Sequence, residues 1–509
     1  MKKIFGRIAI VLPAILLQGL WYYMILKFLD NLFLGHLGYI LNGLLSILAV
    51  LFVSSLVTKR AESSYKLLWV IIILSMPILG ALLYFWVGNK RTGKKLQKRL
   101  KQSSSLLPKL HEANENIISD IKNSDLRLGQ TLEHISNSSG FPLVKNDESK
   151  YYSFGEEMFR DMCEDLRKAE KFIYAEYFII ESGKFWDTLS GIMAQKVREG
   201  VDVRVMYDDL GSIKTYSIKD IRDLYKKGIK CIPFNSFLFI KSQLNNRDHR
   251  KIMVIDGKIA YSGGINLADE YINEKRLYGR WKDIGFRISG EAVRSYEYMF
   301  CEFWNAFSND KIKVSDSCAS KTQIKEKQNG YVLPYYDSPM NEEHISNELF
   351  AEILSLSTEY VWFYTPYLML GDALFDAFIR AAKRGVDVRI IMPGIPDKKI
   401  VYRLSRSYYM DLLKAGVKIY EYSPGFIHAK AFIADDKICG IGTVNLDYRS
   451  LFLNFECNSI FYNADIIKDL KEDYLATQRD STERTIYDVE KGPLYNLINN
   501  FLRIIAPFL

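Results

Sequence analysis

Two short stretches of the chain place a lysine two residues after a histidine. The first holds His249 and Lys251, and the second holds His428 and Lys430. Apolar runs follow both, so each pair is expected on a β-strand, where residues two apart project from one face. An imidazole beside an ammonium suits an anionic centre: lysines hold phosphate oxygens, one neutral histidine attacks phosphorus, and the other protonates the leaving oxygen. The spacing therefore predicts chemistry on a phosphate ester.

Further polar residues follow both histidines at equal distances. Asp256 and Asp435 come seven residues later, and Asn266 and Asn445 come seventeen residues later. The asparagine amides are expected to bind or orient the substrate phosphate. The aspartates belong to the repeated catalytic motif, and within it we expect a structural role at the strand ends. A single histidine on a strand is usually structural, but two copies that agree at four positions, in a chain with six histidines, favour a functional site.

Two acids could orient the imidazoles. Asp283 follows His249 by 34 residues, and Glu456 follows His428 by 28 residues. A reacting imidazole is usually held by an acid on its other nitrogen, so both carboxylates are predicted to orient the histidines. The alternative is a carboxylate at a strand end in an ordinary salt bridge.

The elements that must position these residues also occur twice. Apolar, β-rich runs at 172–178 and 361–367 are each followed by a helical stretch, a glycine and a further β-branched run. Alternating strands and helices predict an α/β fold with a largely parallel sheet. The repeat predicts two duplicated α/β domains, 150–315 and 330–509, related by a pseudo-two-fold axis and sharing one active site.

The first 89 residues are mostly apolar. Three stretches, Ile8–Leu29, Leu32–Val57 and Leu67–Val87, each have about the length that crosses a bilayer. They predict two or three transmembrane helices and a multi-pass protein of the cell membrane. The first stretch could instead be a signal peptide, and a buried helical hairpin of a soluble protein is the other alternative.

A basic segment follows the apolar stretches. The 509-residue chain has a net charge of +8, and seven positive charges lie within residues 90–101. They favour the cytoplasmic side for the catalytic part and contact with anionic phospholipids rather than nucleic acid. Three spans would place Lys2, Lys3 and Arg7 on the other side, so the number of spans stays open. Residues 90–149 are interpreted as this basic collar and a connector.

The motifs resemble those of the phospholipase D superfamily. The wider segments 246–252, 263–271, 281–283, 426–430 and 445–456 are similar to bacterial cardiolipin synthases. The resemblance implies one active site between the halves, without metal or cofactor, in which His249 forms a phosphohistidine and His428 acts as general acid and then base. The implied reaction joins two phosphatidylglycerols into cardiolipin and releases glycerol. The family's usual Gly-Ser is Gly263-Gly264 in one half and Gly442-Thr443 in the other.

Two other functions stay open. A membrane-anchored phosphodiesterase of the phospholipase D type, acting on a phospholipid or on nucleic acid, would use the same residues, because water and an alcohol compete for one phosphohistidine. A non-catalytic lipid-binding scaffold predicts a degenerate motif in one half, whereas both motifs are intact. The oligomeric state and the choice of acceptor alcohol are left open by the sequence.

Overall fold

The computed structural model describes residues 32–59, 62–84, 94–110, 115–235, 245–315, 330–341, 343–489 and 492–506, with Gly19 and Tyr23. The chain divides into two compact units. The first comprises 1–91, 237–245 and 497–509, and the second comprises 92–236 and 246–496. The predicted apolar stretch Ile8–Leu29 lies outside the described residues, apart from Gly19 and Tyr23, as do residues 90–93 of the basic collar. The boundaries predicted at 89, 149, 315 and 330 stay predictions.

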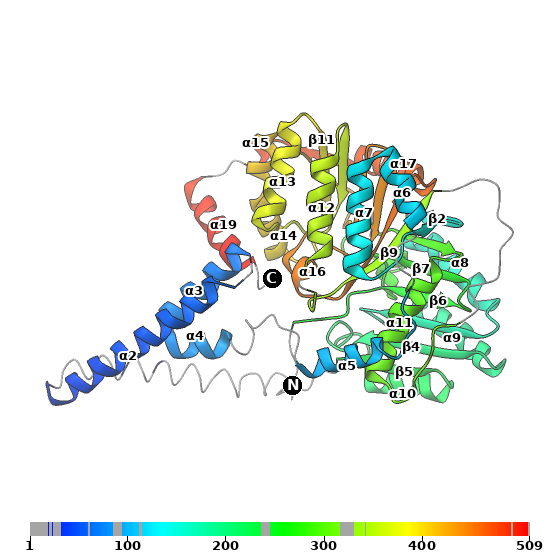
Figure 1. The fold of residues 1–509 in the computed structure, drawn as a ribbon, viewed down its shortest axis with the longest axis horizontal. Coiled ribbons are helices and arrows are strands. Elements are labelled where there is room, and N and C mark those ends of the chain that lie inside the picture. The colour runs from blue at the N-terminus through cyan, green and yellow to red at the C-terminus, as the bar shows by residue number, and fades with distance from the viewer. Residues whose placement is uncertain are drawn as a thin grey trace. The chain divides into compact units, whose positions relative to one another are not determined.

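The first unit contains the helices α2 (Leu32–Val57), α3 (Ser63–Ser75) and α4 (Pro77–Leu83) (Figure 1). The third apolar stretch, Leu67–Val87, is therefore not one helix. Pro77 lacks the N–H that would continue α3, and the break at Met76 starts α4 with the proline in its first turn. A Cβ on Gly80 would lie 2.6 Å from the carbonyl oxygen of Ile72, so only glycine allows α4 to pack this closely on α3.

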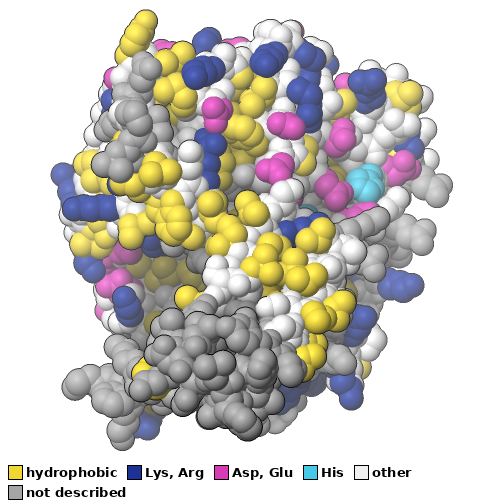
Figure 2. All heavy atoms as spheres, turned by 90° about the vertical axis from the view of Figure 1, so that its left-hand side faces the viewer, with side chains coloured by type: hydrophobic (Ala, Val, Ile, Leu, Met, Phe, Trp, Pro, Cys, Tyr) yellow, Lys and Arg dark blue, Asp and Glu magenta, His cyan; other side chains and the backbone are white. Residues whose placement is uncertain are grey.

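Many apolar side chains of this unit are exposed. Those of α2, α3 and α4 that are at least 50% exposed are Leu44, Ile47, Leu48, Val50, Leu51, Val57, Leu67, Leu74 and Leu82. Figure 2 shows hydrophobic side chains gathered in patches on one face of the molecule. Within the described residues, no helix is both long enough and apolar enough to cross a membrane.

The segment interpreted as a connector is folded rather than extended. It forms α5 (Lys94–Ser104), α6 (Glu115–Ser124), α7 (Leu126–Ser139) and the short strand β1 (Val144–Lys145). Asp125 caps α7 by accepting a hydrogen bond from Leu128 N, and Gly140 ends it in the left-handed conformation. Leu128, Leu132 and Ile135 on α7 are buried. The connector therefore contributes to the core of the second unit.

The second unit contains two sheets with the same central order of strands. The seven-stranded sheet runs β2-β8-β7-β6-β3-β4-β5. Its strands are β2 (Glu148–Tyr152), β3 (Phe172–Tyr177), β4 (Asp202–Asp208), β5 (Lys230–Phe234), β6 (Ile252–Ile255), β7 (Ile259–Gly263) and β8 (Gly285–Ser289). The nine-stranded sheet repeats this order as β9-β15-β14-β13-β10-β11-β12 and adds β1 and β16 at its edges. Its other strands are β9 (Tyr331–Asp337), β10 (Tyr360–Tyr364), β11 (Asp387–Pro393), β12 (Lys418–Tyr422), β13 (Ala431–Ala434), β14 (Ile438–Gly442), β15 (Glu456–Tyr462) and β16 (Ser481–Arg484).

The prediction of a largely parallel sheet is wrong. Only β3, β4 and β5 in one sheet, and β10, β11 and β12 in the other, run parallel, while the remaining neighbours are antiparallel. The reason is the short connection after each motif strand. Three residues, 256–258 and 435–437, join β6 to β7 and β13 to β14, and so short a link permits only a hairpin. Each sheet is therefore mixed.

Helices cover the sheets. In the first half these are α8 (Gly155–Arg167), α9 (Lys184–Arg198), α10 (Ile218–Lys226), η2 (Asp269–Ile272) and α11 (Val293–Phe307). In the second half they are α12 (Ile345–Leu356), α13 (Asp372–Lys383), α14 (Lys399–Ser407), α15 (Tyr409–Ala415), α16 (Tyr448–Phe452), α17 (Ile466–Arg479) and α18 (Ile486–Val489), and α19 (Pro493–Ile505) follows. Helix α11 packs on β3, β5 and β6 and also contacts β9 of the other half, and α17 contacts β2. The two halves are thus held together by elements that each contributes to the other.

Candidate active site

Each histidine motif pairs through its backbone with the acid segment of the other half. His249 N donates to Phe455 O at 2.9 Å, and Phe455 N donates to Arg247 O at 2.8 Å. In the second motif, His428 N donates to Lys282 O at 2.6 Å, and Lys282 N donates to Phe426 O at 2.9 Å. These two short parallel pairings place the residues of both halves in one site.

As a result, each histidine lies next to the predicted orienting acid of the other half. Nδ1 of His249 lies 2.8 Å from Oε2 of Glu456, and Nδ1 of His428 lies 2.6 Å from Oδ2 of Asp283. The sequence left this pairing open: within each half, Asp283 follows His249 and Glu456 follows His428. Both carboxyl groups are fully buried. With Nδ1 bound to a carboxylate, each imidazole keeps Nε2 for a substrate.

The two acids are held in different ways, which accounts for the departures at Gly264 and Thr443. Asp283 accepts a hydrogen bond from Ile284 N at 2.8 Å, and a Cβ on Gly264 would lie 2.0 Å from its Oδ1, so a side chain there would displace the carboxylate. In the other half Thr443 Oγ1 donates to Glu456 Oε2 at 2.5 Å. Asn454 Nδ2 donates to the other oxygen of Glu456 at 3.2 Å.

Both lysines are buried beside the histidines. Lys251 Nζ donates to His249 O at 2.6 Å, and Lys430 Nζ donates to His428 O. The charges of Lys251 and Lys430 both act on both imidazoles, and His249 acts on His428. The structure thus brings together the four histidine and lysine side chains that the sequence predicted. A site with two ammonium groups and two imidazoles suits a phosphodiester.

Burial sets the titration of the site. Desolvation, followed by the charges of the two lysines, holds the pKa of both His249 and His428 well below 6.5, so both rings are neutral near pH 7. Burial raises the pKa of Asp283 and of Glu456 to about 7 despite the nearby lysines. Burial also lowers the pKa of Lys251 to about 8 and that of Lys430 to about 7.

Each of the two motif asparagines is held by hydrogen bonds to neighbouring groups. Asn266 Nδ2 donates to the hydroxyl of Tyr271 at 2.7 Å, and Ile179 N donates to Asn266 Oδ1 at 3.1 Å. Asn445 Nδ2 donates to Asp447 Oδ2 at 2.9 Å. Because an amide carries two N–H groups, each asparagine has a second N–H that these bonds do not use.

The motif aspartates do not join the histidines. The carboxylate of Asp256 accepts hydrogen bonds from the N–H groups of residues 170, 171 and 172, at 2.7 to 2.9 Å, where β3 begins. Asp435 does the same for residues 358, 359 and 360 at the start of β10. A four-residue strand, which spans about 13 Å, separates each aspartate from its lysine, so the carboxylates lie at the opposite end of the strand from the imidazoles.

The first motif has a buried ionic cluster around Arg250 that has no counterpart at the matching position of the second motif. Arg250 is fully buried, and its guanidinium lies 2.6 Å from Glu176 and 3.1 Å from Asp248. Asp208 accepts a hydrogen bond from Asp248 N at 3.0 Å. In the second motif the position of Arg250 is taken by the buried Ala429. The ionic cluster fixes the backbone that carries His249.

Sequence reasoning missed several residues of the site. Thr443 was noted only as a departure, although it positions Glu456. The charge of Lys398 acts on His428. Arg449 is a further cation, close to Asp447 and Glu456, and burial lowers the pKa of Arg449. Trp281, Phe426 and Tyr271 have ring centres 5.4 to 5.9 Å from that of His428. Lys398 and Arg449 do not belong to a repeated sequence motif, and aromatic residues are common in any core, so the sequence did not single them out.

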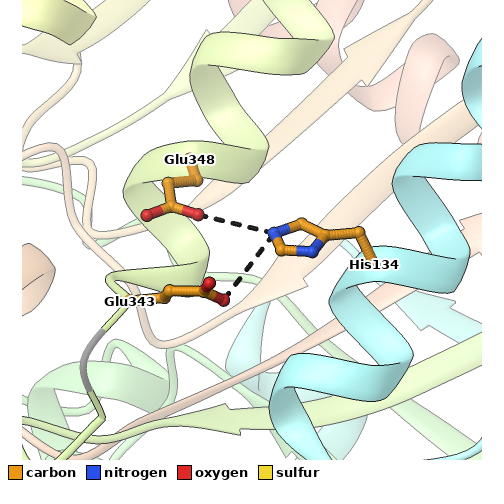
Figure 3. A group of neighbouring side chains, drawn as sticks. All are labelled: His134, Glu343 and Glu348. Carbon is orange, nitrogen blue, oxygen red and sulfur yellow. Dashed lines mark ion pairs between the residues drawn. The ribbon is translucent and has the colours of Figure 1, made fainter.

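One group of described side chains outside this site has the composition of a metal site. His134 on α7 lies 3.8 Å from Glu343 and 3.6 Å from Glu348 (Figure 3). About half of each of these side chains is exposed, and Ser138 donates to Glu343 at 2.7 Å. As it stands, the cluster is a solvated ion-pair group that links α7 to the start of α12.

Comparison with known families agrees with this site. The family described as "Cardiolipin synthase, PLD-like domain" matches twice, over residues 162–296 and 350–476. The two matches contain the two histidine motifs and both orienting acids. The family described as "Phospholipase D-nuclease N-terminal" matches residues 44–89.

Known proteins match over nearly the whole chain. An uncharacterized protein of Streptococcus mutans is 40% identical, with 89% of this chain and 98% of that protein covered. A cardiolipin synthase of a Geobacillus species is 33% identical over 93% of this chain and 95% of its own length. Cardiolipin synthase 2 of Bacillus anthracis is 33% identical over 89% and 88%.

A solved structure shares the fold. The phosphatidylserine synthase of Haemophilus influenzae superposes with a TM-score of 0.58 at 14% identity, and the match covers 75% of this chain and all of that one. The family predicted from the motifs is therefore confirmed. Since the family model matches two domains and the two cardiolipin synthases are each 33% identical over 95% and 88% of their own lengths, the chain belongs to the cardiolipin synthase family of the phospholipase D superfamily.

Proposed function

We propose that the protein is a phosphatidyltransferase that joins two phosphatidylglycerols into cardiolipin and releases glycerol. One observation carries this proposal: two neutral imidazoles share one site with two buried lysines, and each imidazole is oriented through Nδ1 by a carboxylate of the other half. Such a site can form and break a bond to phosphorus without a resident cofactor.

In the first step Nε2 of His249 attacks the phosphorus of one phosphatidylglycerol. The bond between phosphorus and the glycerol headgroup oxygen breaks, and that oxygen leaves with a proton from Nε2 of His428. The products are a phosphatidyl group bound to His249 and free glycerol. The positive charge that develops on His249 is balanced by Glu456.

In the second step the primary hydroxyl of another phosphatidylglycerol attacks the same phosphorus. His428, now without its proton, takes the proton of that hydroxyl while the bond from phosphorus to His249 breaks. The enzyme returns to its starting state and cardiolipin is released. Lys251, Lys430 and the second N–H groups of the two asparagines bind the phosphate oxygens in both steps.

The electrostatics of the site are compatible with these roles. His249 is neutral near pH 7, as a nucleophile must be. His428 is also neutral near pH 7 and must gain a proton before it can act as an acid. A bound phosphodiester offsets the charges of the two lysines that lower the pKa of His428, so binding of substrate raises that pKa towards the working range.

We also propose that the apolar N-terminal region anchors the enzyme in the cell membrane, with the catalytic domains on the cytoplasmic side. The exposed apolar side chains of α2, α3 and α4 support this proposal, because soluble surfaces rarely expose so many. Helix α5 adds basic residues directly after this region. Such residues suit the anionic headgroups of the cytoplasmic leaflet.

Lipid analysis of the purified full-length chain tests the proposed reaction. With labelled phosphatidylglycerol in vesicles, we expect cardiolipin and glycerol in equal amounts. His249→Ala should abolish both products, whereas His134→Ala, which removes a half-exposed histidine outside the site, should leave the rate unchanged. Phosphatidic acid as the main product would identify a hydrolase and overturn the transferase proposal. An active His249→Ala variant would overturn the assignment of the nucleophile.

A further inference from the structure

Two loops meet beside the second histidine motif. Arg280 N donates to Pro424 O at 3.0 Å, and Ile395 N, just after β11, donates to Gly425 O at 3.1 Å. Gly279 has a φ of 72°, and a Cβ there would lie 3.0 Å from Cδ1 of Ile395. The loop 276–280 is therefore held tightly against the segment 394–400 that leads into α14.

These two segments expose apolar and basic side chains together. Leu277, Ile395 and Ile400 are 51%, 40% and 61% exposed. Arg276, Lys398 and Lys399 are exposed among them. We call these six residues the docking rim. Lys398 lies 3.9 Å from Asp397, and no carboxylate in the described parts of the chain forms an ion pair with Arg276 or Lys399.

The carboxylates close to the docking rim are already engaged. Asp397 accepts a hydrogen bond from the hydroxyl of Tyr367 at 2.6 Å. Glu274 pairs with Lys184, and Glu181 pairs with Lys275. The docking rim therefore presents a net positive charge around its exposed apolar side chains.

Aromatic side chains connect the docking rim to the catalytic centre. Lys398 Nζ lies 5.2 Å from the ring centre of Tyr367, and the rings of Tyr367 and Tyr278 lie 6.4 and 6.3 Å from that of Phe426. Phe426 in turn lies 5.9 Å from His428. The charge of Lys398 is close enough to lower the pKa of His428. The rim therefore lies on the His428 side of the site.

We propose that the docking rim seats the catalytic domains on an anionic phospholipid surface, so that lipid reaches the site from the side of His428. This proposal rests on the proposed function, because it assumes a substrate that lies in a bilayer. Apolar side chains surrounded by lysine and arginine are the composition that binds the headgroup region of anionic membranes. The close bracing of the two loops presents them as one rigid surface.

Fluorescent labelling of the docking rim tests its position. The five described cysteines are buried, so the full-length chain with Cys318→Ser and Ile400→Cys accepts an environment-sensitive label at one exposed position. The matched control is Ile218→Cys, which labels a 71% exposed isoleucine at the start of α10 in the first half. Both variants are placed in phosphatidylglycerol–phosphatidylcholine vesicles with nitroxide-labelled lipid.

We expect the lipid to quench the label at position 400 several times more strongly than the label at 218. Replacing Arg276 and Lys399 by alanine should weaken the docking equilibrium by about fivefold per residue, which corresponds to ~1 kcal/mol each. Equal quenching at 400 and 218 overturns the proposal. A label at 400 that is shielded from solvent without being quenched by lipid also overturns it, because the rim would then meet protein, such as a second copy of the chain.

Activity measurements separate docking from catalysis. Ile395→Ser with Ile400→Ser should slow cardiolipin formation from bilayer phosphatidylglycerol several-fold, and leave turnover of a dispersed short-chain phosphatidylglycerol unchanged. Equal losses on both substrates would place these residues in the site and overturn the proposal. Failure of the proposed function would appear differently: the unchanged chain would make no cardiolipin from either substrate, while the quenching result would still decide whether the rim meets lipid.

Discussion

The crossed contact between Glu456 and His249 predicts that a substitution in the second half disables the proposed nucleophile of the first. Glu456→Gln keeps the size of the side chain and removes a charge 2.8 Å from Nδ1 of His249. The amide oxygen can still accept the Nδ1 proton, so the ring stays oriented. The positive charge that forms on the imidazole during attack then lacks its counter-charge.

The contact geometry sets the size of this effect. A charge-assisted hydrogen bond is worth about 1.5–3 kcal/mol, which corresponds to roughly a 10- to 150-fold change in rate. The Coulomb energy of two unit charges 2.8 Å apart, at an effective dielectric constant of about 20, is about 6 kcal/mol and gives an upper limit near 10⁴-fold. We therefore expect the first step to slow by about one to four orders of magnitude.

A trapping assay isolates that step. Phosphatidylglycerol labelled in its phosphate is mixed with enzyme, the reaction is stopped with acid-free denaturant, and protein-bound label is followed over time. Glu456→Gln should reduce the rate of labelling, as His249→Ala should. Asp283→Asn should also slow labelling, because Asp283 holds His428, which protonates the glycerol oxygen that leaves in the same step.

A matched control removes a different buried carboxylate of the same strand pair. Asp337 on β9 is the register partner of Glu456, and it accepts hydrogen bonds from Ser338 N and Ser346 N rather than from a histidine. Asp337→Asn should keep the labelling rate within about tenfold of the unchanged enzyme, since no histidine loses a partner. The crossed assignment would be refuted if Asp283→Asn abolished labelling of His249 while Glu456→Gln left it intact.

Three further predictions follow from the site. The pKa of Glu456 is raised to about 7 and that of Lys430 is lowered to about 7, and the reaction needs Glu456 ionised and Lys430 protonated. As pH rises, kcat/KM should therefore first increase and then decrease, in a narrow bell near neutrality. A flat profile from about pH 6 to about pH 9 would contradict this. Asp256→Asn and Asp435→Asn each keep a residue that tolerates the positive φ, but each removes a charged acceptor of three backbone N–H groups. The free energy of unfolding measured with urea should therefore fall by ~2–4 kcal/mol while kcat stays unchanged. A loss of kcat at full stability would refute the structural role. Thr443→Val should lower the rate about tenfold by removing the donor to Glu456, Thr443→Ser should restore it, and equal rates for both variants would argue against this positioning role.

The chemistry of this protein could be predicted from the sequence, because reactive residue types at a repeated spacing need no knowledge of the fold. His249 and Lys251, and their counterparts in the second half, were expected on one face of a strand. In the structure they lie directly before the strands, because β6 begins at Ile252 and β13 begins at Ala431. Duplication was equally visible, since both copies keep the same order of apolar runs and glycines. The orienting acids were found as residues, but not as pairs.

Sheet direction, helix breaks and the packing of the connector depended on more than local pattern. An apolar run looks the same in the sequence whether its sheet is parallel or antiparallel. The antiparallel hairpins after β6 and β13 were therefore not predicted. In the apolar N-terminal region, α3 ends before Pro77, although hydropathy alone showed one continuous apolar stretch. Helix α7 buries three residues of a segment whose composition indicated a connector.

The sequence by itself determined which residues could react with a phosphate and that they occur twice. Only the tertiary structure decided that Glu456 serves His249 and that Asp283 serves His428, because this depends on which backbone segments of the two halves run side by side. It also decided that Asp256 and Asp435 bind the backbone where β3 and β10 begin, since a four-residue strand of about 13 Å separates them from the lysines. Spacing along a chain fixes the faces of one element, whereas partners across two halves are fixed only by packing.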